Sequence, residues 1–267
     1  QRIAPTMSYA IGQQNNHGTS EAAALFIGGS FLANHDSRAK EWERKGRRWL
    51  EDRAATLIER DGSFSQYSVN YHRFMLDTFS LAEAWRRRRD LPPFSERLNS
   101  RLAAATEWLW LLTDGYTGDA PNMGANDGAR LVPLTGGDYR DFRPSVQLAT
   151  ALFRSADAFG PGSWTDPLRW LGVADQKSSV NPYSKSFDDG GYHVLRTEQA
   201  MSVLRYPRFN FRPSQADAMH VDLWHRGTNL LRDAGTFSYN AKGAEWFSGT
   251  AAHNTVEFDG RDQMPRL

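Results

Sequence analysis

Apolar residues recur at intervals of three and four positions over most of the first 171 residues, which is the spacing of amphipathic helices. Leu25 and Trp49 belong to the first of these runs, and turn-forming residues at 61–62 and 91–93 interrupt the pattern. A glycine-rich stretch at 114–143 predicts a long loop. We therefore predict helices of hairpin length that begin near residue 18 and continue at 67–89, 94–113, 144–158 and 164–171.

The pattern changes after residue 182 to short alternating runs bounded by glycine, proline or asparagine. Residues 192–195 and 200–206 are typical of antiparallel strands. Helices and strands do not alternate along the chain, so the pattern predicts an α+β fold rather than a parallel α/β fold. We expect two domains, a helical one over 1–175 and an antiparallel β-sheet domain over 176–267.

Composition excludes several classes of protein. The 267 residues suffice for a buried core, and 32 Lys and Arg against 31 Asp and Glu give a net charge of +1. Without a global positive field, we expect no nucleic-acid partner, and an anionic ligand must meet a local cluster. The absence of cysteine excludes disulfides and thiolate metal sites but leaves the compartment open.

Targeting signals are not evident in the sequence. No apolar run reaches the length of a membrane-spanning helix, so we expect no membrane span. The first residues lack the basic start and apolar core of a signal peptide. Since the chain opens on Gln1 rather than Met, we expect an excised part of a longer protein.

The first polar cluster lies where the first clear helix begins. Asn16, His17 and Glu21 border this helix start, whose free amides and dipole attract anions. An ordinary helix cap with a first-turn acid explains Asn16 and Glu21 equally well. His17 favours a ligand site slightly, because capping does not need an imidazole.

The second polar cluster, residues 61–73, runs into another helix and contains Tyr71 and Arg73. A tyrosine, whose usual pKa is about 10, becomes a base near neutral pH only beside cations such as Arg73 or a histidine. If alternate helices run in the same direction, both helix starts lie at the same end of the helical domain and line one opening. The alternative is that Tyr71 is a half-buried aromatic residue of the helix.

The third cluster lies in the β region, at 212–224, 230–236 and 252–255. Side chains alternate between the faces of a strand. We expect one set to point into the sheet core, namely Met219, Val221 and Leu223. His220, Asp222 and Trp224 then point the other way, toward the helical domain, and we expect His220 to line a cleft.

In order and spacing these clusters resemble the heparinase II/III family of polysaccharide lyases. The resemblance implies that 1–175 is the C-terminal part of an incomplete α/α toroid of helical hairpins, and that 176–267 is the N-terminal part of an antiparallel β-sheet sandwich domain. It also implies that Asn16 and His17 neutralise a substrate uronate, that Tyr71 transfers the proton, and that a β-domain histidine, here His220, assists.

A structural metal is also implied by the resemblance, with Gln215, Asp233 and His253 as ligands on neighbouring strands. Glutamine is a weaker ligand for zinc than histidine, so zinc, calcium and the absence of a metal all stay open at this site, and no organic cofactor is expected. Many relatives have His-x-His where this chain has Pro213 and Gln215. Either His220 replaces the missing catalytic histidine, or nothing does.

The implied reaction is β-elimination in an anionic polysaccharide, either heparin-like or a bacterial exopolysaccharide. Removing the C5 proton of a uronate places negative charge on its carboxylate, which donors at the first helix start would hold. The expected location is periplasmic or secreted. The candidate substrate contacts are Glu21, Arg73, Asn126 and Arg212.

Two other functions remain open. A glycoside hydrolase would need a carboxylate pair, such as Glu21 with Asp127 or Asp217. A non-catalytic glycan-binding protein would fit the Pro213 departure and the near-neutral charge. Elimination creates a conjugated product that absorbs near ~230 nm, whereas hydrolysis and binding do not.

Overall fold

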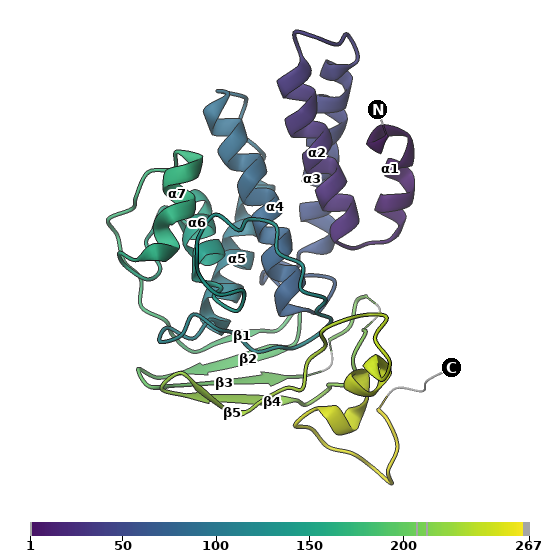
Figure 1. The fold of residues 1–267 in the computed structure, drawn as a ribbon, viewed down its shortest axis with the longest axis vertical. Helices are drawn as coiled ribbons and strands as arrows, with labels where there is room; N and C mark the ends of the chain where they lie inside the picture. The colour runs from purple at the N-terminus through teal and green to yellow at the C-terminus, as the bar shows by residue number, and fades with distance from the viewer. Residues whose placement is uncertain (1, 207, 212, 264–267) are drawn as a thin grey trace.

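The computed structural model describes residues 2–206, 208–211 and 213–263. Helices come first and strands second, and the predicted α+β class is confirmed (Figure 1). The helices are α1 (Ile3–Gly12), α2 (Asn16–Leu32), α3 (Ala39–Leu57), α4 (Val69–Arg88), α5 (Glu96–Leu112), α6 (Arg143–Phe153) and α7 (Asp166–Leu171), with short 3-10 turns η1 (Ser163–Thr165), η2 (Ala244–Ser248) and η3 (Thr250–Ala252).

The strands form one antiparallel sheet in sequence order. They are β1 (Lys185–Phe187), β2 (Tyr192–Arg196), β3 (Ala200–Arg205), β4 (Val221–His225) and β5 (Thr228–Leu231). Within the described residues this sheet is a single layer, so the second layer of a sandwich stays a prediction. The change from helix to strand falls between Leu171 and Lys185, and the predicted domain boundary near residue 175 lies in that interval.

One hydrophobic core joins the helices to the sheet. Trp108 of α5 packs edge-on against Tyr192 of β2, with ring centroids 5.1 Å apart, and stacks on His72 of α4 at 4.4 Å. Trp224 of β4 belongs to the same core. The helices therefore cover one face of the sheet (Figure 1).

Side chains along β4 alternate between buried and exposed, as predicted. The face of the strand that packs in the core is the opposite of the one predicted. Asp222 is fully buried and Trp224 is 3% exposed, whereas Met219 is 47% exposed and Val221 and Leu223 are partly exposed. The prediction that Met219, Val221 and Leu223 fill the sheet core is wrong, because the core lies on the helix side of the sheet. The prediction that the opposite set faces the helices is confirmed by Trp224.

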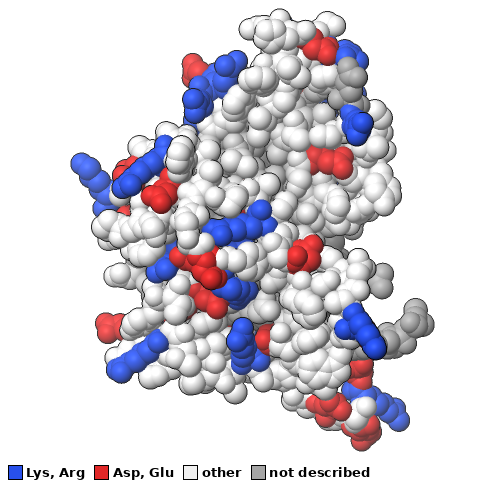
Figure 2. All heavy atoms as spheres, viewed as in Figure 1, with Lys and Arg blue, Asp and Glu red and all other residues white. Residues whose placement is uncertain are grey.

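Charges are mixed over the surface. Figure 2 shows Lys and Arg interspersed with Asp and Glu on this face, without one large area of a single sign. Within the described part of the chain, we find no helix whose length and apolar character would allow it to cross a bilayer. Recognition of an anion on this face therefore depends on individual side chains.

Candidate functional site

The starts of α2 and the segment before α4 are in direct contact. Asn15 caps α2 by accepting a hydrogen bond from the His17 amide at 3.0 Å, and the Asn16 amide donates to Gln66 Oε1 at 2.8 Å. The Asn16 side chain is half-buried and that of His17 is exposed. This contact brings the first two sequence clusters to one place on the surface.

Tyr71 sits in the first turn of α4 and is 6% exposed. Ser68 caps this helix by accepting from the Tyr71 amide at 3.1 Å, and its hydroxyl donates to the Ala125 carbonyl at 2.6 Å. Burial raises the pKa of Tyr71, and its interactions with the Tyr239 side chain and the Asp127 carboxylate raise it further. Tyr71 is therefore a phenol at neutral pH, and not the phenolate that a cationic neighbour would produce.

Tyr239 is a site residue that the sequence analysis missed. It is 57% exposed, and its side chain interacts with that of Tyr71. Burial raises the pKa of Tyr239, the interaction with Tyr71 acts in the opposite direction, and the net shift is upward. Tyr239 lines a cavity of about 270 Å³ together with Asn15, Gln66 and Ser214, between the α2 start and the β region. Its only sequence signal is its position soon after Asp233.

Arg73 does not contact the cavity, which corrects its assignment to the substrate. It is 1% exposed, and its Nη1 and Nη2 donate to the Tyr139 carbonyl at 2.6 Å and to Asn70 Oδ1 at 2.7 Å. The guanidinium also lies over the Phe142 ring, 4.3 Å from its centroid. Arg73 therefore holds the 139–142 segment against α4, and burial lowers its pKa.

Asn126 is likewise used inside the protein. It is 7% exposed, its Oδ1 accepts from the Tyr139 hydroxyl at 2.7 Å, and its Nδ2 donates to Asn122 Oδ1 at 2.9 Å. These bonds occupy its amide, so the structure removes it from the substrate contacts. Among the other candidate contacts, Glu21 is half-buried at the start of α2, and Arg212 lies outside the described residues.

His220 does not line a cleft, which corrects that prediction. It is fully buried just before β4, with Nε2 3.5 Å from Asp233 Oδ2 and 3.7 Å from Asp222 Oδ2. A polysaccharide has no access to this imidazole. Asp217 is also fully buried and accepts a hydrogen bond from Arg205, so it is unsuited to be one of a hydrolase's two catalytic carboxylates.

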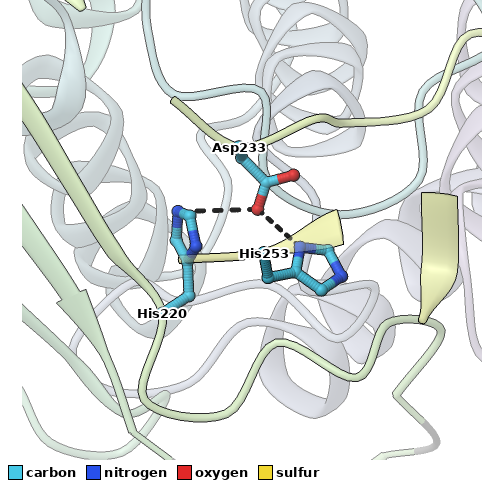
Figure 3. Close-up of side chains that lie close together, drawn as sticks. All are labelled: His220, Asp233 and His253. Atoms are coloured by element: carbon cyan, nitrogen blue, oxygen red, sulfur yellow. Dashed lines mark hydrogen bonds and ion pairs between the residues drawn. The ribbon is translucent and has the colours of Figure 1, made fainter. Parts of the chain in front are cut away.

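The predicted metal ligands come from loops rather than from neighbouring strands. Gln215 precedes β4, Asp233 follows β5, and His253 follows η3. Asp233 Oδ2 nevertheless lies 2.9 Å from His253 Nδ1, and one potential ligand atom from each of His220, Asp233 and His253 lies within 4.8 Å of the others (Figure 3). Gln215 Oε1 and His253 Nε2 are buried without a hydrogen-bond partner.

This buried cluster carries more negative than positive charge. Arg205, Asp217, Asp222 and Asp233 are each at most 1% exposed, so this region buries three carboxyl groups and one guanidinium. Burial raises the pKa of Asp217, against the charge of Arg205. Burial lowers the pKa of His253, but the hydrogen bond and charge of Asp233 outweigh it, so the net shift is upward. The cluster therefore favours an added positive charge.

The α+β fold, with helices on one face of an antiparallel sheet, matches known proteins. Residues 179–267 match the family described as Heparinase II/III-like, C-terminal, so the resemblance inferred from the motifs is confirmed. A heparin-sulfate lyase of Bacteroides stercoris is 27% identical over 105 residues, which is 36% of this chain and 16% of that protein.

Two solved structures share the fold over 93% of the chain. A crystal structure of heparinase III gives a TM-score of 0.66 at 20% identity, and the heparan sulfate lyase HepC of Pedobacter heparinus gives 0.67 at 20% identity. The chain covers 40% and 38% of these two proteins. It therefore corresponds to less than half the length of either.

Proposed function

We propose that this chain carries the β-elimination site of a polysaccharide lyase that acts on a uronate-containing, heparan-like glycan. The observation that carries the proposal is the interaction of the Tyr71 and Tyr239 side chains, with Tyr239 in the cavity beside the start of α2. Two phenols in contact offer a proton donor and a proton acceptor. The similarity to a heparin-sulfate lyase and to a heparan sulfate lyase supports the substrate class.

The reaction removes the C5 proton, breaks the bond from C4 to O4, and leaves a double bond between C4 and C5. Negative charge grows on the uronate carboxylate as the proton leaves. Asn16 and His17 would meet this charge at the N-terminus of α2, where preorganised donors are worth about 3 to 4 kcal/mol each in other enzymes. The exposed side chain of His17 is accessible to a polymer.

The two tyrosines would divide the proton transfers. Tyr71 keeps its proton because burial and its acceptors raise its pKa, so it would protonate the departing O4. Tyr239 is the exposed member of the pair, so it is the one that could reach the C5 proton. Burial raises its pKa and the interaction with Tyr71 opposes this rise only in part, so Tyr239 would first have to lose its proton to act as the base. This revises the expectation that Tyr71, as a phenolate, takes the C5 proton and that either protonated Tyr71 or His220 passes a proton to O4.

A divalent cation bound by Gln215, Asp233 and His253 is part of the proposal. An amide oxygen, a carboxylate and an imidazole suit zinc, and their oxygen atoms suit calcium. The unpartnered atoms of Gln215 and His253 and the excess of buried carboxylates support a cation here. It would cross-link the loops that flank β4 and β5, and it would have no role in proton transfer.

The test removes each phenol while keeping its ring. Tyr71→Phe and Tyr239→Phe, made in the full-length protein, should each lower the rate of product formation, read near ~230 nm, at least ~100-fold. Tyr9→Phe is the matched control, because Tyr9 is 74% exposed on α1, and it should keep the parent rate. Uronate glycans of the heparan, alginate and hyaluronan types form the substrate panel.

A substrate with a better leaving group separates the two roles. If O4 carries an aryl group of low pKa, departure no longer needs a proton donor. Tyr71→Phe should then recover most of its rate, whereas Tyr239→Phe should not. Near-normal elimination by Tyr71→Phe on the natural substrate would refute its role. Binding of a uronate glycan without turnover in the parent protein would favour the glycan-binding alternative.

A further inference from the structure

His220 combines complete burial with an unusual set of neighbours. Its Nε2 lies close to the carboxylates of both Asp222 and Asp233. Among the described residues, however, no group makes a hydrogen bond of acceptable geometry with this nitrogen. Proximity alone makes it look like a third metal ligand beside His253 (Figure 3). Its other ring nitrogen decides whether this is possible.

The backbone amide of Asn254 donates to His220 Nδ1 at 3.1 Å. A backbone N–H can only donate, so Nδ1 must present its lone pair and carry no proton. In neutral imidazole the proton then resides on Nε2. An Nε2 that carries a proton has no lone pair to give to a metal, so His220 is a donor at the position nearest to Asp233.

That donor faces two carboxylates. Nε2 lies 3.5 Å from Asp233 Oδ2 and 3.7 Å from Asp222 Oδ2, while Asp222 also accepts from the Trp224 indole through Oδ1 and from the Asp233 amide at 3.4 Å through Oδ2. Asp222 is therefore supplied with other donors. Asp233 Oδ2 is held from its second side by His253 Nδ1 at 2.9 Å.

We propose that His220 is a positioning residue, fixed by Asn254 as the Nε2–H tautomer, that orients the Asp233 carboxylate toward His253 without binding the metal itself. Only the test by metal affinity rests on the proposed metal site. The tautomer can be measured without a metal, because it is a property of the protein alone. Donors to a ligating carboxylate typically change metal affinity 10–100-fold when removed.

The first test measures the tautomer in the parent full-length protein. Two-bond ¹H–¹⁵N correlation spectra of histidine-labelled protein distinguish a proton on Nε2 from one on Nδ1. We expect the Nε2–H pattern for His220, both after chelation and after addition of zinc. An Nδ1–H pattern, or a zinc-induced shift typical of a ligating Nε2, would overturn the proposal.

The second test uses two variants that each keep one half of the imidazole. His220→Gln keeps a donor near the Nε2 position, whereas the shorter His220→Asn keeps an acceptor near Nδ1 but places no donor at the Nε2 position. By calorimetric titration of chelated protein with zinc chloride and with calcium chloride, His220→Gln should stay within a few-fold of the parent and His220→Asn should lose 10–100-fold. Equal losses in both variants would contradict the positioning role.

The two proposals fail in different ways. If the parent binds neither ion but shows the Nε2–H tautomer, the metal proposal is wrong and the orientation of Asp233 by His220 stands. If the parent binds an ion and His220 shows the Nδ1–H tautomer, the metal stands and the positioning role is wrong. Near-ultraviolet circular dichroism of both variants excludes unfolding as the cause of a lost affinity.

Discussion

Asp77 of α4 is a buried carboxyl group, and its titration makes the unfolding free energy of the protein depend on pH. It is 1% exposed, and burial raises its pKa from 3.8 to about 6, although the nearby Ser145 hydroxyl and the charge of Arg73 act in the other direction. A raised pKa means that the folded protein holds this proton more tightly than the unfolded chain does. The associated stability is fully present below pH 3.8 and is lost as pH rises through about 6.

The size of the effect follows from the two pKa values. A difference of about two pKa units corresponds to about 3 kcal/mol of unfolding free energy. Asp77→Asn cannot titrate, so its unfolding free energy relative to the parent should rise by up to about 3 kcal/mol between pH 4 and pH 7.5. Loss of the interaction with Arg73 adds a cost in unfolding free energy that is the same at every pH. It therefore does not change how the difference between the two proteins varies with pH.

The assay is urea unfolding of both proteins at a series of pH values across that interval. Ser80→Ala, a neutral change at a fully buried position of the same helix, is the control and should give a pH-independent difference. Parallel stability curves for Asp77→Asn and the parent would refute the reasoning, since they would mean that Asp77 is ionised in the folded protein at no net cost.

Two substitutions test the packing around the site. Gly124→Ala should lower stability by about 1–3 kcal/mol in thermal unfolding, because Gly124 has φ of +80° and a Cβ there would lie 2.2 Å from the Tyr67 carbonyl; an unchanged melting temperature would contradict this close approach. Arg205→Met should cost about 3–5 kcal/mol in chemical unfolding, because it leaves the Asp217 carboxylate buried without its cation. Adding Asp217→Leu should recover part of that loss, and a double variant as unstable as the single one would show that the charge is not the cause.

Long amphipathic helices were the part of the fold best predicted from sequence. The ranges 67–89 and 94–113 bracket α4 and α5 closely, since many periodic positions define each helix. Short elements carry less information, and α1 was not predicted. The helix expected to reach residue 158 ends at Phe153, because Ser155 adopts φ of +51°, which a helix does not accommodate.

Residues of the candidate site could be predicted from the sequence only where the neighbouring residues in the chain mark them. Asn16 and Tyr71 were found because each lies at the start of a helix, which leaves a mark in neighbouring residues. Tyr239 was missed because its importance comes from contact with Tyr71, a residue far away in sequence. Arg73 was assigned to substrate because a charge beside Tyr71 suggested catalysis, whereas the side chain points into the interior.

Residues that never touch a substrate nevertheless decide where the tyrosine pair lies. Thr236 Oγ1 accepts from the Asn126 amide at 2.5 Å and donates to its carbonyl at 3.1 Å, so the loop that ends at Tyr239 is tied to the loop that carries Asp127. The same loop begins at Asp233, in the buried cluster. Because only the short connection 233–239 separates the cluster from Tyr239, we expect a change in the cluster to alter the position of Tyr239, which is the proposed base.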